Sequence, residues 1–292
     1  MKLLSPAKIN LFLQVVGKRP DGYHDLISLM CCVSLYDTIS FTFGVKATTV
    51  SCQHPDIPQD ETNLAFAAAD LFFKSLNKSE GVGIMIEKRI PVAAGLGGGS
   101  SNAATVLAGL NRHYGSPFSQ KDLVSIGLAI GADVPFFLFG RPAIATGVGE
   151  QLEAYKDLEK FNILLIYPGF GVSTAKVYKN LNLRLTKCKK KLRYSLLKKQ
   201  GFDIQSHLCN DLETVAVLEH PDILAAKEAL IKHGAGGTLM SGSGPTVFGL
   251  FSDSAKARKA SKKIYQENNK WQLYLADMIT QDTNSELMMP DI

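Results

Sequence analysis

The sequence lacks the long apolar runs that mark membrane-spanning or exported proteins. No stretch approaches the ~18 uninterrupted apolar residues of a membrane-spanning helix. The first residues, MKLLSPAKINLFLQVVG, look at first like an export signal, but Pro6, Lys8 and Asn10 interrupt the apolar part and no small-residue cleavage site follows. We therefore expect a cytoplasmic protein with no membrane partner.

Cysteine is scarce, and its spacing indicates neither a disulfide framework nor a zinc site. The five cysteines are Cys31, Cys32, Cys52, Cys188 and Cys209. Their number is odd, and the one close pair is adjacent in the chain, which is not the spacing of zinc ligands. We expect all of them to be reduced and structural.

The sequence also lacks an even spread of positive charge. The formal net charge is +5, but the segment 184–199 alone holds eight basic residues and no acidic one, so the rest of the chain is net negative. Two interpretations remain open for this segment: a solvated connecting face, or a patch that attracts an anionic partner. Its single aromatic residue, Tyr194, offers little stacking surface for RNA bases.

What the sequence does contain is the composition of a globular protein with room for two domains. Its 292 residues are 46% hydrophobic and 20% charged. Ser119 and Asp122 form a capping-box pattern at the start of one helix. Strand patterns at 9–16, 37–43, 82–86, 161–169 and 271–275 are interspersed with helical patterns at 63–76, 119–130, 222–233 and 255–267. Because 150–160 is polar, we expect an α+β protein with domains at 1–155 and 156–292.

Glycine is concentrated in the segment PVAAGLGGGSSNAATVLAGL, residues 91–110. Four glycines between 95 and 99 follow an alternating strand and lead into an alanine-rich helix. Glycine lets the backbone approach a ligand, and the first turn of a helix offers unpaired N–H groups, so the segment predicts a phosphate-binding loop. It lacks the Gly-Lys-Ser/Thr of a P-loop and the last glycine of a dinucleotide-binding fingerprint. The alternative is a tight turn packed under a helix.

A second informative segment is PAKINLFLQVVGKRPDGYHDL, residues 6–26. Lys8 and Asn10 are two residues apart on a predicted strand and share one face, where polar groups among apolar neighbours need a reason. An exposed strand edge is the alternative. The turn RPDGYH places Tyr23 and His24 in a loop, where a histidine is ordinarily a surface residue.

Two further segments combine glycine or proline with polar side chains. In GADVPFFLFG (131–140), Asp133 precedes Val-Pro at a predicted helix start, where it would cap the helix without excluding catalysis. In GAGGTLMSGSGPTVFGLF (234–251), Gly242, Gly244 and Pro245 separate two apolar runs. That pattern predicts either a hairpin turn or a second backbone cradle.

Together the four segments resemble the GHMP kinases, a superfamily that includes galactokinase, homoserine kinase, mevalonate kinase and phosphomevalonate kinase. PAKINLFLQVVGKRPDGYHDL, PVAAGLGGGSSNAATVLAGL, GADVPFFL and MSGSGPTVFGLF occur in the family's order and at roughly its spacing. The resemblance covers nearly the whole chain and is weakest at 180–205 and after 265. It implies an amino-terminal ATP-binding domain, a carboxyl-terminal α/β sandwich-type domain, and ATP-dependent phosphorylation of a small-molecule hydroxyl.

The resemblance also implies roles in phosphoryl transfer. Asp133 would orient or deprotonate the acceptor hydroxyl, and Lys8 would neutralise the growing charge. Ser100 or Ser101 would lie near Mg²⁺, whose other ligands are left open, and Lys88 is either a nucleotide contact or a surface charge. The implied ATP contacts are Lys88, Pro91, Val92, Ala93, Ala94, Gly95, Leu96, Gly97, Gly98, Gly99, Ser100 and Ser101.

Lys-Ile-Asn and Arg-Pro-Asp-Gly-Tyr-His are particular to one branch of the family, whose acceptor carries a cytidine diphosphate group in the non-mevalonate route to isoprenoid precursors. Tyr23 and His24 would contact the cytosine, and Tyr178 would stack on it where better-known members have phenylalanine. The implied acceptor contacts are Asn10, Tyr23, His24, Tyr178, Gly242, Ser243 and Gly244.

Other functions remain as alternatives to this interpretation. Within the family, the acceptor could be another small molecule such as mevalonate or homoserine. Outside it, the alternatives are a nicotinamide-dependent oxidoreductase and an RNA-binding protein. We expect no nucleic-acid partner, and a monomer or a weak homodimer.

Overall fold

The computed structural model describes residues 1–156, 158–182, 188 and 202–281, and it shows helices and strands mixed along the chain. Apart from Cys188, the basic segment 184–199 lies outside the described residues, so neither interpretation of it is tested. No helix in the described ranges combines the length and the apolar character that crossing a membrane requires.

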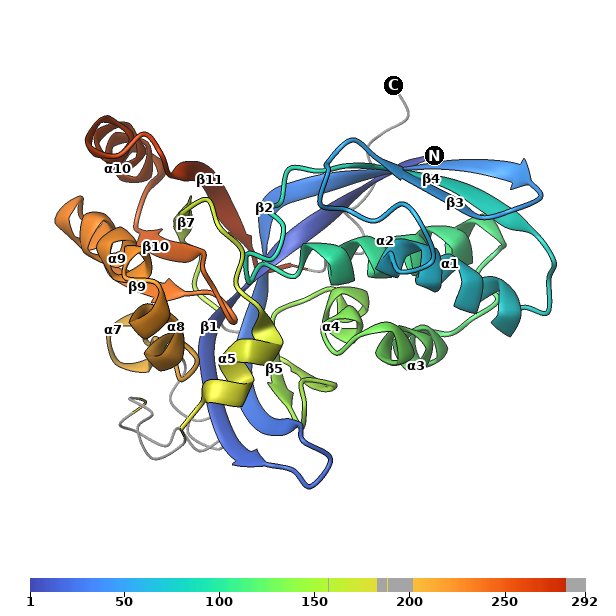
Figure 1. The fold of residues 1–292 in the computed structure, drawn as a ribbon, viewed down its shortest axis with the longest axis horizontal. Helices are drawn as coiled ribbons and strands as arrows, with labels where there is room; N and C mark the ends of the chain where they lie inside the picture. The colour runs from blue at the N-terminus through green and yellow to red at the C-terminus, as the bar shows by residue number, and fades with distance from the viewer. Residues whose placement is uncertain (157, 183–187, 189–201, 282–292) are drawn as a thin grey trace.

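A long antiparallel hairpin connects the two halves of the molecule. It consists of β1 (Lys2–Lys18) and β2 (His24–Val45), which pair along almost their whole length. In Figure 1 this hairpin runs between a group of helices on each side. The strand β2 is much longer than the predicted 37–43, and His24 is its first residue, so the expectation of a loop at His24 was wrong.

The first half of the chain builds one sheet with helices on one face. β3 (Thr49–Cys52) and β4 (Gly81–Glu87) extend β2, and β5 (Ala143–Thr146) pairs with both β2 and β6 (Gln151–Ala154). The helices are α1 (Leu64–Ser75), α2 (Gly98–His113), α3 (Gln120–Ile130) and α4 (Val134–Phe139). They pack against the sheet through a core that includes Phe72, Leu107 and Phe136. The capping box of Ser119 and Asp122 at the start of α3 is confirmed.

The second half forms an antiparallel sheet covered by helices. Its elements are β7 (Asn162–Tyr167), α5 (Thr174–Asn180), α7 (Ile204–His207), β8 (Cys209–Asn210), α8 (Glu213–Glu219), α9 (Asp222–Lys232), β9 (Gly237–Met240), β10 (Val247–Phe251), α10 (Ser254–Glu267) and β11 (Gln272–Ile279). β11 pairs with both β7 and β2, and β8 pairs with β1. Strands from the two sides of the predicted domain boundary at 155/156 are therefore hydrogen-bonded to each other. The position of that boundary remains a prediction.

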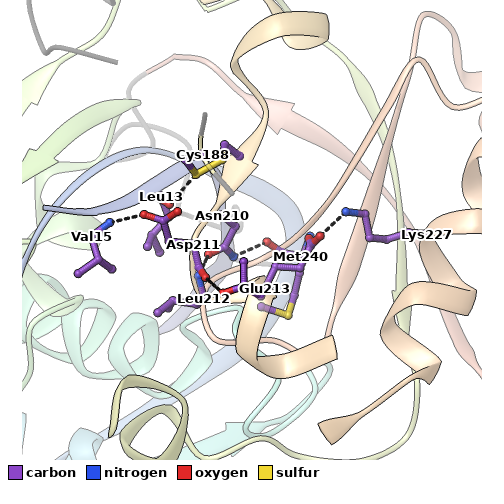
Figure 2. The surroundings of a disulfide bond; sticks show 11 residues. Leu13, Val15, Cys188, Asn210, Asp211, Leu212, Glu213, Lys227 and Met240 are labelled. Carbon is purple, nitrogen blue, oxygen red and sulfur yellow. Dashed lines mark hydrogen bonds and ion pairs between the residues drawn. A yellow bond between two sulfur atoms is a disulfide. The ribbon is translucent and has the colours of Figure 1, made fainter. Parts of the chain in front are cut away.

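The expectation that all cysteines are reduced is wrong. Cys188 and Cys209 form a disulfide, with their Cα atoms 5.8 Å apart, while Cys31, Cys32 and Cys52 are free and buried. Figure 2 shows the bond beside Leu13 and Asp211. The separation of 21 positions between the two cysteines gave no signal for it, because disulfide pairing depends on proximity in the fold rather than on spacing.

Candidate active site

A cavity of about 1150 Å³ lies where the two halves of the molecule meet. Its walls come from β1, the start of β2, the glycine-rich segment before α2, the residues before α4, and α5. The volume exceeds the roughly 300–1,000 Å³ of a pocket for one small ligand, so there is room for two. Of the predicted ATP and acceptor contacts, the cavity is lined by Asn10, Tyr23, His24, Lys88, Pro91, Val92, Ala93, Ala94, Gly95, Gly97, Gly98, Gly99, Ser100, Tyr178, Gly242 and Ser243.

Lys8 and Asn10 point from one face of β1 into this cavity, beside Asp133. Lys8 Nζ donates to Asn10 Oδ1 at 2.6 Å and lies 3.6 Å from Asp133 Oδ2. Asn10 Nδ2 donates to Ser28 Oγ at 2.9 Å, which fixes the orientation of the amide. Lys8 is only 4% exposed, so the exposed-edge alternative for this pair is wrong. The structure thus brings together the two residues predicted to act on the acceptor hydroxyl.

Asp133 occupies the N-cap position of α4, as predicted, but its side chain makes no capping hydrogen bond. The short helix that follows is apolar and buried, with Phe136 fully enclosed. Packing of that helix holds the backbone at Asp133 in place, while the carboxylate faces the cavity with 40% of the side chain exposed. A capping role therefore does not account for this aspartate.

The glycine-rich segment forms a backbone cradle at the amino end of α2. Gly95 and Gly97 have positive φ angles of 75° and 71°, a region that strongly favours glycine. A Cβ atom at Gly95 would overlap the carbonyl oxygen of Ser241, and one at Gly97 would lie 3.1 Å from Lys8 Cγ. No side chain caps the first turn of α2, so its N–H groups and the positive end of the helix dipole face the cavity side. This arrangement suits an anion.

Lys88 lies beside this cradle and is not a surface charge. Its side chain is 5% exposed and forms an ion pair with Asp37, which is fully buried. A Cβ atom on Gly98 would lie 3.0 Å from Lys88 Nζ, which places the ammonium at the start of α2. Asp37 also accepts from the backbone N–H groups of Arg89 and Ile90, at 2.8 and 2.9 Å.

Three of the predicted contacts do not line the cavity. Leu96 belongs to the buried core, and Gly244 packs against Met240 behind the loop that Gly242 and Ser243 present. Ser101 is fully buried, and its Oγ accepts a hydrogen bond of 2.8 Å from Ser5. Of the two serines predicted near a metal ion, the cavity therefore contains Ser100.

At the other end of the cavity, the rings of His24 and Tyr178 form a tilted pair. Their ring centroids are 5.3 Å apart and the planes differ by 30°. Burial, and next the charge of Lys18, lower the pKa of His24, so its ring is neutral at pH 7. Burial, and next the charge of Asp133, raise the pKa of Tyr178. Tyr23, 64% exposed, lies at the rim. The three predicted acceptor aromatics thus share one end of the site.

Several polar residues around the site carried no signal in the sequence. Asp37 reads as an ordinary residue in an alternating strand, and Ser28 lies in a largely apolar segment. The segment Asn210–Glu213 binds the loop 241–244 from behind, with Asn210 and Asp211 both buried. Ser28 binds Asn10 across 18 residues and Asp211 binds Val15 across 196, so local patterns could not reveal these contacts.

Comparisons with known proteins place this geometry in a family. The model of the GHMP kinases N terminal domain matches residues 63–141, and that of the GHMP kinases C terminal matches 174–270. The chain is 47% identical over 261 residues to a 4-diphosphocytidyl-2-C-methyl-D-erythritol kinase of Syntrophus aciditrophicus (strain SB), covering 89% of this chain and 93% of that protein. It is 45% identical over 277 residues to the protein of that name from Syntrophotalea carbinolica, covering 94% and 98%.

Solved structures agree with this placement. A crystal structure of 4-(cytidine 5'-diphospho)-2C-methyl-D-erythritol kinase superposes with a TM-score of 0.77 at 34% identity, covering 95% of this chain and 99% of that one. A homoserine kinase from Cytophaga hutchinsonii superposes with a TM-score of 0.74 at 17% identity, covering 97% of this chain and 95% of that one. At that identity the second likeness shows the shared fold alone.

Proposed function

Since the chain belongs to the 4-diphosphocytidyl-2-C-methyl-D-erythritol kinases, a family of ATP-dependent enzymes with the α+β GHMP kinase fold, we propose that it phosphorylates the 2-hydroxyl of 4-diphosphocytidyl-2-C-methyl-D-erythritol. The observation that carries the proposal is that Lys8, Asn10 and Asp133 meet in the cavity, where Lys8 packs against Gly97 of the cradle and the charge of Asp133 is near enough to raise the pKa of Tyr178. A hydroxyl bound at one end can there meet a triphosphate bound at the other.

The reaction needs orientation and charge neutralisation more than covalent chemistry. Asp133 accepts a hydrogen bond from the acceptor hydroxyl and then its proton, as the hydroxyl oxygen bonds to the γ-phosphorus. The bond from that phosphorus to the bridging oxygen of ADP breaks. Lys8, poorly exposed and already 3.6 Å from Asp133, offsets the charge that develops on the transferred group.

The amino end of α2 supports the binding of the triphosphate of ATP. Its uncapped N–H groups, the close-packed Gly95 and Gly97, and the ammonium of Lys88 all favour phosphate oxygens. Ser100 lines the cavity, and its hydroxyl would supply an oxygen ligand for Mg²⁺, which would neutralise the phosphate charge. A magnesium ion usually keeps several waters and binds substrate phosphates with few protein ligands, so a single hydroxyl fits it.

The aromatic end of the cavity supports a nucleoside on the acceptor. Tyr178 on α5 and His24 at the start of β2 come from different halves of the chain, and their ring centroids lie 5.3 Å apart with the planes tilted by 30°. Flat apolar ring faces bind a pyrimidine, and the neutral imidazole has one N–H donor and one acceptor for its polar edge. A cavity of about 1150 Å³ can hold the long cytidine diphosphate group together with ATP.

The proposal is tested by ADP release with Mg·ATP across a panel of acceptors: the cytidyl methylerythritol, mevalonate and homoserine. We expect turnover with the first and background rates with the other two. Turnover of mevalonate or homoserine at a comparable kcat/KM would contradict the proposed substrate but leave the kinase assignment intact.

A further inference from the structure

The segment Asn210–Glu213 lies behind the active site and contains no predicted site residue. We propose that Asn210 is a positioning residue for phosphoryl transfer, which holds the loop 241–244 against Lys8 and Asn10. The inference deepens the proposed kinase function and rests on it. It also explains why a buried polar segment, with Asn210 5% and Asp211 1% exposed, lies where β8 pairs with β1.

The side-chain amide of Asn210 binds the end of β9 and the loop that follows it, one with each of its donor hydrogens. Its Nδ2 donates to the carbonyl oxygens of Met240 and Gly242, at 2.8 and 2.7 Å. Its Oδ1 accepts from the N–H of Leu212 at 3.0 Å, which fixes the way the amide faces. An amide has two donor hydrogens, so its donor capacity is fully used on the backbone of Met240 and Gly242. Figure 2 shows Asn210 beside Met240.

The neighbours of Asn210 hold the segment itself in place. On one side, Asp211 binds β1: its N–H donates to Leu13 O at 2.9 Å, and its Oδ2 accepts from Val15 N at 2.9 Å. On the other side, Glu213 accepts from Met240 N at 3.0 Å and pairs with Lys227. Figure 2 shows both connections. The segment that carries the Asn210 side chain is therefore hydrogen-bonded to both β1 and β9, which fixes its position.

The loop that Asn210 holds touches the groups that act in the reaction. Gly242 has a φ of 54°, and a Cβ atom there would lie 3.2 Å from Lys8 Nζ and 3.4 Å from Asn10 Oδ1. Ser241 Oγ donates to Gly95 O at 3.0 Å, so the same loop also contacts the phosphate cradle. A shift of the loop would displace Lys8 and the cradle together. Misplacement of a reacting group by about 1 Å can cost about a hundredfold in rate.

The test compares Asn210→Asp with Thr214→Val. Asn210→Asp keeps the shape but turns an oxygen toward two carbonyl oxygens. The Thr214 hydroxyl donates to Asp211 O at 2.7 Å in the same segment, and its replacement leaves the Asn210 amide in place. We expect Asn210→Asp to lower kcat about a hundredfold and also to raise the Kd for ATP, because the loop contacts the phosphate cradle, whereas Thr214→Val should stay within about threefold in both.

The readouts separate positioning from mere stability. A folded Asn210→Asp with wild-type kcat would overturn the inference, as would equal losses in both variants that follow their melting temperatures. If Asn210→Asp does not fold, amide hydrogen exchange of the wild-type protein tests whether the loop is held in place. The N–H groups of Ser241 and Gly244 donate to Thr246 O and Ser241 O, and we expect them to exchange as slowly as the N–H groups of β1. Fast exchange there overturns the inference. A wild type that turns over no acceptor instead contradicts the kinase proposal, and the inference falls with it.

Discussion

Lys8 is the residue whose surroundings say most about the chemistry. A buried ammonium is costly unless it is paired and hydrogen-bonded. Here the amide of Asn10 supplies the hydrogen bond, and the half-exposed carboxylate of Asp133 supplies the opposite charge from the cavity wall. Because Asp133 is accessible and Lys8 is not, the carboxylate meets the incoming hydroxyl while the ammonium stays fixed. The pair therefore works as one unit in the proposed reaction.

Asp133→Asn should lower kcat roughly a thousandfold, because the amide accepts a proton poorly, and should leave the Kd for ATP within a few-fold. Lys8→Met should show a comparable loss. Since the two residues act together, the double variant should lose far less than the product of the single losses. Steady-state turnover and nucleotide binding measure both effects. Asp122→Asn, an exposed carboxylate at the start of α3, is the matched control. Strict multiplicativity would argue for separate roles.

The lowered pKa of His24 predicts how acceptor binding depends on pH. Burial disfavours the imidazolium, and Lys18 repels it, so the folded protein takes up this proton at a lower pH than a free histidine with a pKa of about 6.5. The contacts that the neutral ring makes with the acceptor are present above the lowered pKa of His24 and are lost as the pH falls through it. We expect the acceptor KM to stay flat down to about pH 6.5 and to rise below it. In His24→Asn this acid limb should disappear; an unchanged limb would assign it to another group.

At the scale of elements, the buried pair of Asp37 and Lys88 fixes the entry to the glycine cradle. Asp37 on β2 forms the ion pair with Lys88 and accepts hydrogen bonds from the backbone N–H groups of Arg89 and Ile90. It also accepts from the side-chain amide of Asn102 on α2 at 2.9 Å. One carboxylate thus connects a strand, the segment before the loop, and the helix that follows it.

Asp37→Asn should destabilise the protein by roughly 3–5 kcal/mol, because it leaves the buried ammonium of Lys88 without its counter-charge. Urea unfolding measures the change. In the double variant Asp37→Asn/Lys88→Met no uncompensated charge remains, so its loss should be smaller than that of Asp37→Asn alone. A double variant that is less stable by the sum of both single losses would show that the two side chains do not interact.

The same strand shows which elements the sequence could predict. In β2 the residues from Ser34 to Phe41 alternate between partly exposed and buried, and the predicted strand at 37–43 overlaps that alternating part. Residues 28–33 are all buried, because other strands and helices cover both faces, so they lack the period of two that identifies a strand. The helices α3, α9 and α10, each with one apolar face, were predicted to within a few residues.

At the scale of the whole molecule, the sequence could place the motifs but not the network that joins them. Lys8, Asp133 and the glycine cradle were identified because each combines unusual residues in a short segment. Asp37, Asn210 and the disulfide of Cys188 and Cys209 depend on pairs that are far apart in the chain and meet only in the fold. Side chains of this kind look ordinary in the sequence, since their burial is decided by the tertiary structure.

The arrangement of the whole molecule also decides which acceptor is bound. The aromatic end of the cavity takes His24 from the first half of the chain and Tyr178 from the second, so a nucleoside would bind across both halves. Tyr178→Ala should weaken acceptor binding by roughly 1–3 kcal/mol, the range for base stacking on an aromatic ring, and should barely change ATP affinity. Tyr265→Ala, an exposed tyrosine on α10, is the matched control.

The comparison that tests this most directly is turnover of the cytidyl substrate against methylerythritol without its nucleotide. Both carry the same hydroxyl, and the bare polyol lacks the diphosphate as well as the base that we propose to lie at His24 and Tyr178. We expect kcat/KM to be lower for the bare polyol by at least about tenfold, because binding energy at the base is lost, and we expect Tyr178→Ala to reduce that ratio. Equal kcat/KM for the two acceptors would contradict the proposal that the cytosine binds at His24 and Tyr178, but it would not contradict the proposed role of Asp133 in phosphoryl transfer.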